Sequence, residues 1–287
     1  MPKIQIDGLK LHYWQSGAGS DLILVHGLGG NLAGWHLSMV PQLQSQYRVT
    51  TYDLRGHGKS DVPAAGYTTL EMAQDLLGLM DALDIDQAHI LGHSWGGDVV
   101  LHFSLLHPER VSSLTVVEAG LLAPLADVYR SPDWDGWPYA TKTLETLTGQ
   151  PIPEQHRFDL EYLLKLLLEV PVMFGPAKGR PREEGIINRV WDILTPMWEG
   201  NDFGNSLELE QLAHIVAPTL LLYEQNSTFH GACDVLKQRL PNKTSIMLPR
   251  SDLKHFTGLA HPDLILKHAT TFWALWETEL RRAVGQD

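Results

Sequence analysis

The stretch "AHILGHSWGGDVVLHF" (Ala88–Phe103) passes from an apolar run into a helix-like pattern, with Ser94 at the junction. Glycines stand two residues before and two residues after this serine, at Gly92 and Gly96. A strand-to-helix turn this tight needs neighbours almost without side chains, and it exposes the serine hydroxyl on a strained backbone. The hydroxyl also lies at a helix N-terminus, which favours developing negative charge. The pattern predicts that Ser94 is a nucleophile.

Short apolar runs alternate with amphipathic stretches on both sides of this junction. The apolar runs are typical of strands buried on both faces of a sheet, and they lie at residues 22–27, 48–53, 88–94, 114–120, 219–224 and 245–249. Asp7 and Gly8 predict a hairpin turn between two further strands, at 4–6 and 9–13. Amphipathic patterns at 69–84, 97–107 and 262–282 predict helices. Together they indicate an α/β fold: a mostly parallel, eight-stranded sheet with helices on both faces.

The alternation of strand-like and helix-like segments stops between residues 121 and 212, where helical patterns such as 158–170 and 185–198 replace the strand-like runs. We predict a helical cap at 121–212 on a core domain formed by 1–120 and 213–287. Apolar and aromatic walls in such a cap favour an apolar substrate portion, although most of these side chains should pack the cap onto the sheet. The residues concerned are Tyr129, Trp134, Trp137, Tyr139, Phe158, Tyr162, Met173, Phe174, Trp191 and Trp198.

Composition excludes several classes of partner. The 287 residues carry a formal net charge of −12, which argues against nucleic acid or an anionic membrane as the main partner. No apolar window approaches the roughly 18 residues of a membrane span, and no basic N-terminal region precedes a long apolar stretch. Cys233 is the only cysteine, so no intrachain disulfide can form. We expect a cytoplasmic protein that needs no metal or organic cofactor; the sequence leaves a homo-oligomer open.

A second glycine-rich stretch, His26-Gly27-Leu28-Gly29-Gly30, follows the apolar run at 22–25. Its glycines let backbone amides approach a ligand closely. Acyl transfer needs such donors for the oxyanion that forms when a nucleophile attacks a carbonyl. The amides of Leu28 and Trp95 are the expected pair. A glycine-rich turn without a ligand is the alternative.

At this point the chain resembles the α/β-hydrolase superfamily over nearly its whole length. "DLRGHGKS" (53–60) is similar to the loop after the superfamily's fourth strand, and "KHFTGLAHP" (254–262) is similar to its histidine loop. The resemblance implies that His255 is the general base that takes the proton of Ser94. His26, His57 and His93 also belong to motifs, and structural roles are expected for them.

The carboxylate partner of the histidine is less obvious. Many superfamily members place an Asp after the strand that matches 219–224, and Ser227 occupies that position here, beside Asn226. Neither side chain can carry a negative charge, which leaves Glu224 and Glu118, each at the end of a predicted strand. We prefer Glu118, because its placement is similar to that in the subgroup of haloalkane dehalogenases and Renilla-type luciferase. A carboxylate there would orient the imidazole and stabilise the imidazolium.

The resemblance implies a serine hydrolase that cleaves a carboxylic ester of a small, largely apolar substrate through Ser94, His255, Glu118 and an acyl-enzyme. Haloalkane dehalogenases and epoxide hydrolases use an Asp nucleophile, and the dehalogenases' halide-holding Asn is replaced by Leu28, so carbon–halogen and epoxide cleavage are disfavoured. Three alternatives stay open: a carbon–carbon bond hydrolase acting on a vinylogous diketone, a thioesterase or amidase, and a ligand receptor with low turnover.

Overall fold

The structure is a computed structural model, and it describes residues 2–171, 179–181, 190–195, 204–251 and 254–283. Within these residues, eight strands form one sheet in the order β1-β2-β4-β3-β5-β6-β7-β8. The strands are β1 (Lys3–Ile6), β2 (Leu9–Ser16), β3 (Ser20–Val25), β4 (Tyr47–Tyr52), β5 (Ala88–His93), β6 (Val111–Val117), β7 (Thr219–Glu224) and β8 (Lys243–Leu248). The predicted eight-stranded α/β sheet is confirmed.

The first two strands are the antiparallel part of the sheet. β1 pairs with β2, and β2 with β4, in antiparallel register, whereas the pairs from β4 through β8 are parallel. Asp7 and Gly8 connect β1 to β2 with φ of 37° and 84°, the left-handed values that a two-residue hairpin turn requires. The turn predicted from the Asp-Gly pair is therefore present.

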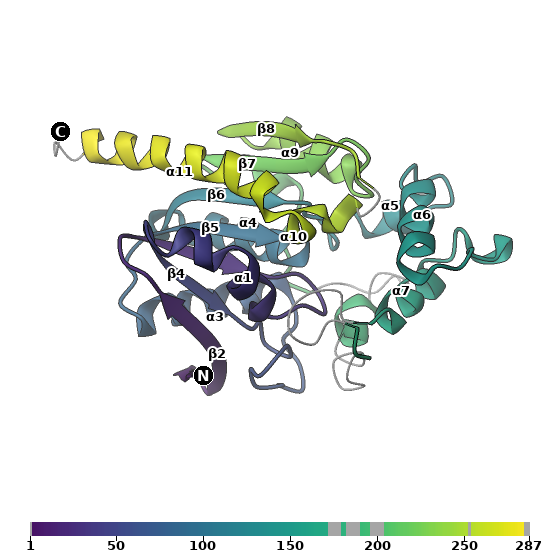
Figure 1. Cartoon of the computed structure of the whole chain (residues 1–287), viewed down its shortest axis with the longest axis horizontal. Coiled ribbons are helices and arrows are strands. Elements are labelled where there is room, and N and C mark those ends of the chain that lie inside the picture. The colour runs from purple at the N-terminus through teal and green to yellow at the C-terminus, as the bar shows by residue number, and fades with distance from the viewer. Residues whose placement is uncertain (1, 172–178, 182–189, 196–203, 252–253, 284–287) are drawn as a thin grey trace.

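Helices cover both faces of the sheet (Figure 1). One hydrophobic cluster joins the sheet to α3 (Thr69–Ala82), α4 (Trp95–Leu106) and α9 (His230–Arg239), through residues such as Leu76, Phe103 and Leu236. A second cluster joins it to α1 (Leu32–Ser38), α2 (Val40–Leu43) and α11 (Pro262–Ala283), through residues such as Trp35 and Trp273. Two-sided burial is what the unbroken apolar runs of the central strands predict.

A group of helices lies beyond one end of the sheet (Figure 1). It contains α5 (Ala126–Arg130), α6 (Trp137–Thr148) and α7 (Leu160–Glu169), and residues 190–195 are also helical. These helices lie in the segment where the sequence predicts a cap insertion. Its limits at 121 and 212 stay a prediction. The rest of the predicted helix at 185–198 falls outside the described residues, and so do Met173, Phe174 and Trp198.

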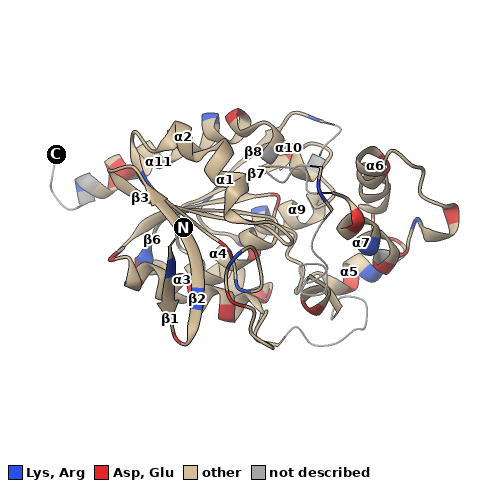
Figure 2. Cartoon of the chain, turned by 60° about the horizontal axis from the view of Figure 1, so that its bottom comes forward, with Lys and Arg blue, Asp and Glu red and all other residues tan. Residues whose placement is uncertain are grey.

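Short elements complete the fold. They are η1 (Pro108–Arg110), η2 (Glu154–His156), η3 (Glu210–His214), η4 (Lys254–Phe256) and α10 (Thr257–Ala260). Figure 2 shows acidic and basic residues spread over the outer helices and loops rather than gathered in one patch. In the part of the chain that the structure describes, no helix has the length and hydropathy that a membrane crossing demands.

Candidate active site

Ser94 lies in a sharp turn between β5 and α4. Its φ of 55° and ψ of −127° are strained for a residue with a side chain, and its amide donates to the Val117 carbonyl at 2.9 Å. The flanking glycines make this turn sterically feasible. A Cβ at Gly92 would lie 2.3 Å from the Gly96 carbonyl oxygen, and one at Gly96 would lie 2.5 Å from the His26 carbonyl oxygen. The chain thus has the tight turn that its glycine spacing predicts.

The glycine-rich loop after β3 packs directly against this serine. A Cβ at Gly27 would lie 2.8 Å from the Cβ of Ser94, so even a methyl group would displace one of the two segments. His26 holds the loop in place. Its Nε2 accepts from the Leu54 amide at 3.1 Å, so Nδ1 carries the proton and donates to the Gly27 carbonyl at 2.8 Å. Burial lowers the pKa of His26, in keeping with this neutral, structural state.

His57 supports the same region from the loop after β4. Its Nδ1 lies 2.9 Å from the Arg55 carbonyl, and its ring packs against the ring of His26 with centroids 5.2 Å apart. These contacts fit the structural role expected of both histidines.

The amides of Leu28 and Trp95 flank Ser94 on these two loops. Within the described residues, neither amide donates a hydrogen bond to a protein acceptor. The Trp95 indole takes no part in the pocket wall: it is buried in the core, and its N–H donates to the Met72 sulfur at 3.1 Å. Any role of Trp95 in an oxyanion site would therefore rest on its backbone amide and not on its side chain.

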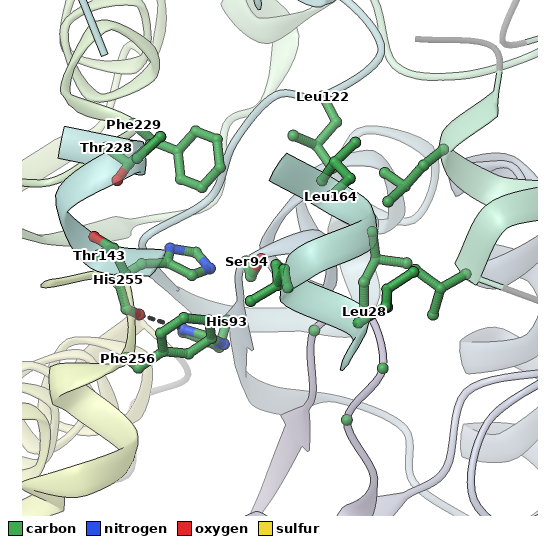
Figure 3. A pocket seen from close by; sticks show the side chains of 18 of the residues that line it. Leu28, His93, Ser94, Leu122, Thr143, Leu164, Thr228, Phe229, His255 and Phe256 are labelled. Carbon is green, nitrogen blue, oxygen red and sulfur yellow. Dashed lines mark hydrogen bonds between the residues drawn. The ribbon is translucent and has the colours of Figure 1, made fainter. Parts of the chain in front are cut away.

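His255 reaches the site from η4, on the loop after β8. Figure 3 shows its imidazole pointing toward Ser94 across the pocket. His93 donates from Nε2 to the His255 carbonyl at 2.9 Å, and the two rings lie 4.8 Å apart, so His93 fixes the histidine loop against β5. Burial lowers the pKa of His255 and of His93 to about 3, which keeps both imidazoles neutral.

Glu118 is the carboxylate that the fold brings to this histidine. It follows β6 with a φ of 53°, and its Oε2 lies 3.7 Å from Nδ1 of His255. That distance is too long for a hydrogen bond but within ion-pair range, and such contacts often tighten only when a ligand binds. Glu224 is engaged elsewhere, because its Oε2 accepts the Ser251 amide at 3.0 Å.

Both oxygens of Glu118 receive hydrogen bonds from β7 and the loop that follows it. Oε1 accepts the Glu224 amide at 2.6 Å, and Oε2 accepts the hydroxyl of Ser227. Burial nevertheless raises the pKa of Glu118 to about 7. From the sequence, Ser227 was noted only as the residue that occupies the position of the usual Asp. Its contact with Glu118 joins residues more than a hundred positions apart in the sequence, so no local sequence pattern predicts it.

Sequence reasoning also missed Asp98, in the first turn of α4. Its carboxylate is buried and accepts the amides of Leu121 and Leu122 at 2.9 and 2.8 Å, which fixes the loop directly after Glu118. Burial raises the pKa of Asp98 to about 7, although these amides oppose the shift. An acidic residue near a helix start is common in sequences, so nothing in the sequence marks this one as buried.

Ser94 and His255 line a cavity of about 250 Å³, and Glu118 lies behind His255, outside the cavity lining. The described walls of the cavity are largely apolar, and none of its described lining residues is Asp, Glu, Lys or Arg. Figure 3 shows Leu28, Leu122 and Leu164 on one side and Phe229 and Phe256 beside His255. Of the cap aromatics singled out in the sequence, Tyr129, Trp134 and Trp137 line the cavity. Among the described residues, no three metal-ligating side chains lie close enough to hold an ion.

Comparisons with known proteins agree with this architecture. A family model described as "alpha/beta hydrolase fold" matches residues 22–150. The dihydrolipoyllysine-residue acetyltransferase component of the acetoin cleaving system of Cupriavidus necator is 38% identical over 113 residues, which cover 39% of this chain and 30% of that protein. The chain thus spans only about a third of that relative's length.

Other similarities extend over nearly the whole chain. The 2-hydroxy-6-oxononadienedioate/2-hydroxy-6-oxononatrienedioate hydrolase of Paraburkholderia xenovorans is 29% identical, over 94% of this chain and 86% of that protein. A solved N-acyl homoserine lactone degrading enzyme superposes with a TM-score of 0.67 at 25% identity, over 94% of this chain and 100% of that one. The matched family model, the sheet order and the strained serine turn together show that the chain has the α/β-hydrolase fold.

Proposed function

We propose that the protein is a serine hydrolase that cleaves a neutral carboxylic ester with a small, largely apolar acyl or alcohol part. One observation supports the proposal: Ser94, on its strained turn, and the facing His255 line a single apolar cavity, with Glu118 next to Nδ1 of His255. A nucleophile, a base and an orienting carboxylate in this arrangement are the parts that acyl transfer needs.

In the proposed first step, the Ser94 hydroxyl attacks the ester carbonyl and its proton passes to Nε2 of His255. Glu118 stabilises the imidazolium through Nδ1, and the amides of Leu28 and Trp95 donate to the oxyanion. When the tetrahedral intermediate collapses, the carbon–oxygen bond of the ester breaks and the imidazolium protonates the leaving alcohol. The acyl group is then bound to Ser94.

In the second step, His255 takes a proton from a water molecule as that water attacks the acyl carbonyl. The new tetrahedral intermediate collapses, the acid leaves, and the proton returns to the Ser94 oxygen. Every proton and every bond is accounted for by the chain, the ester and one water. The proposal therefore calls on no metal and no organic cofactor.

The charge of the cavity wall selects the substrate class. The described lining contains no Lys or Arg, so nothing there would offset the desolvation of a substrate carboxylate. A neutral ester with an apolar portion matches leucine- and tryptophan-rich walls better than a dianion does. Nucleic acid and membrane surfaces are not proposed as partners of a chain with a net charge of −12.

Carbon–carbon bond hydrolysis is the second candidate. It is favoured by the similarity to the Paraburkholderia xenovorans hydrolase, whose name specifies a dienedioate substrate and which aligns with 94% of this chain. The same serine and histidine would serve that reaction. A thioester or an amide would also fit the proposed steps, because each presents a carbonyl and a leaving group to Ser94.

A labelling experiment with a fluorophosphonate tests the nucleophile. The purified protein is expected to bind one equivalent at Ser94, and the Ser94→Ala variant none. If the intact protein is folded but unlabelled, the chain is a ligand receptor rather than a hydrolase.

A substrate panel tests the reaction. Short- and medium-chain p-nitrophenyl esters, the matching thioesters and anilides, and a 2-hydroxy-6-oxo-dienoate are compared at equal concentration. The neutral esters are expected to give the highest kcat/KM. Cleavage of the dienoate without ester turnover would establish the second candidate instead.

A further inference from the structure

The hydroxyl of Ser227 lies between two groups that fix its orientation. Ser227 is fully buried on the loop between β7 and α9, and its Oγ accepts the Phe229 amide at 3.0 Å. The same hydroxyl donates to Oε2 of Glu118. A serine hydroxyl has one proton, and an ionised carboxylate can only accept. With the amide of Phe229 directed at its oxygen, the hydroxyl has its proton free to point at Glu118.

The oxygen that receives this proton is the one that faces the histidine. Oε2 of Glu118 lies 3.7 Å from Nδ1 of His255, whereas Oε1 accepts the Glu224 amide at 2.6 Å. Two donors from one segment therefore set the plane of the carboxylate, and one of them acts at the atom that would hold the imidazolium.

We propose that Ser227 is a positioning residue that keeps Glu118 ionised and aimed at His255, and that it thereby sets the lower pH limit of the reaction. The inference rests on the proposed function, because the ionised carboxylate matters only if His255 works as a base. Hydrogen bonds to an ionised acceptor are stronger than those between neutral groups, so a single hydroxyl can have this effect.

Other titratable groups surround Glu118, and they respond differently. They are His255 and His93 from the histidine loop and β5, Tyr223 from β7 and Cys233 from α9; Asp98 from α4 acts, together with Glu118, on the pKa of Tyr223. Burial lowers the pKa of both histidines to about 3, raises that of Cys233 to about 11 and raises that of Tyr223 far above its usual range.

Burial raises the pKa of Asp98 to about 7, the same value as for Glu118. Its hydrogen-bond donors are the amides after Glu118, and Ser227 is not among them. Loss of the Ser227 hydroxyl should therefore change the protonation of Glu118 and leave that of Asp98 as it was.

The experiment compares the full-length wild type with Ser227→Ala between pH 5 and pH 9. Two rates are followed: phosphonylation of Ser94 by a fluorophosphonate, and kcat/KM for a p-nitrophenyl ester. We expect the acid limb of both profiles to move up by about one to two pH units. Activity should fall by about tenfold or more at pH 6 and return to within about threefold of the wild type at pH 9.

Two further variants make the result specific. Ser227→Cys replaces the hydroxyl with a weaker donor of similar shape and should give a smaller shift in the same direction. Ser104→Ala removes another fully buried serine hydroxyl, one that has no hydrogen-bond partner among the described residues, and should leave the profile unmoved. Infrared titration of the protonated carboxyl band, identified by its loss in Glu118→Gln, reports the same shift without any turnover.

The possible failures are distinguishable. A wild type that is neither labelled nor active on esters removes the proposed function, and the infrared titration then still decides whether Ser227 governs the proton of Glu118. An active Ser227→Ala enzyme whose rates fall equally at every pH, with an unmoved acid limb and carboxyl band, would overturn the inference.

Discussion

Replacing Glu118 with Gln keeps the shape of the side chain and removes its charge. At the 3.7 Å between Oε2 and Nδ1 of His255, the attraction between a carboxylate and an imidazolium is about 4 kcal/mol for an effective dielectric constant of about 20. Because the imidazolium exists in the transition states but not in the resting enzyme, this energy lowers the barrier directly. Each 1.36 kcal/mol corresponds to a factor of ten, so kcat should fall on the order of 10³-fold.

The assay is steady-state hydrolysis of a p-nitrophenyl ester at pH 8, where Glu118 is ionised in the wild type. KM should change little, because the substrate does not touch the carboxylate. Glu224→Gln is the matched control: it alters a second buried glutamate, whose Oε2 accepts the Ser251 amide, and it should cost far less than Glu118→Gln. Equal losses in the two variants, or a larger loss at position 224, would refute the assignment of the acid.

Three other perturbations test separate parts of the structure. Burial raises the pKa of Glu118 from 4.5 to about 7, so between these pH values the folded protein keeps a proton that the unfolded chain releases, and the wild type loses stability as the pH rises. The Tm of Glu118→Gln relative to the wild type should therefore increase from pH 5 to pH 8. A Tm difference that stays constant over this range would contradict the prediction. Gly27→Ala places a methyl group 2.8 Å from Ser94 Cβ and should lower kcat/KM on the order of 100-fold, whereas Gly231→Ala, with nothing within 4 Å, should act like the wild type in the same assay. Asp98→Ala leaves the buried amides of Leu121 and Leu122 without their acceptor and should lower the free energy of unfolding by about 2–4 kcal/mol in urea titrations; unchanged stability would mean that the loop rearranges freely.

The sequence predicts those parts of the fold that local patterns determine. Each central strand is a continuous apolar run, because both of its faces are buried, and the runs at 88–94 and 219–224 match β5 and β7 closely. Several helices were not predicted individually. α1 has only seven residues beside a glycine-rich loop, and α6 presents a buried face of Trp137, Thr143 and Leu144 that only the neighbouring cap helices explain.

The candidate site also contains residues that local sequence patterns predict and residues that only the fold identifies. Ser94 could be placed from its glycines, because their spacing reflects contacts within one turn. Glu118 and Glu224 both end strands, and the sequence alone favours neither on physical grounds. The left-handed backbone at Glu118 and the hydrogen bonds from β7 turn its carboxylate toward His255. Such contacts depend on how neighbouring strands are ordered, which a single sequence does not contain.

The register between β5 and β6 has a consequence for how the protein would fail on heating. His93 pairs with Val117, and the Ser94 amide donates to the Val117 carbonyl. Ser94 and Glu118 therefore follow directly on two paired strands in the centre of the sheet. The imidazole at 255 joins them from a separate loop, held to β5 through the His93–His255 hydrogen bond. Warming should therefore release the histidine while the ladder is still intact, and catalysis would disappear several degrees before the core melts.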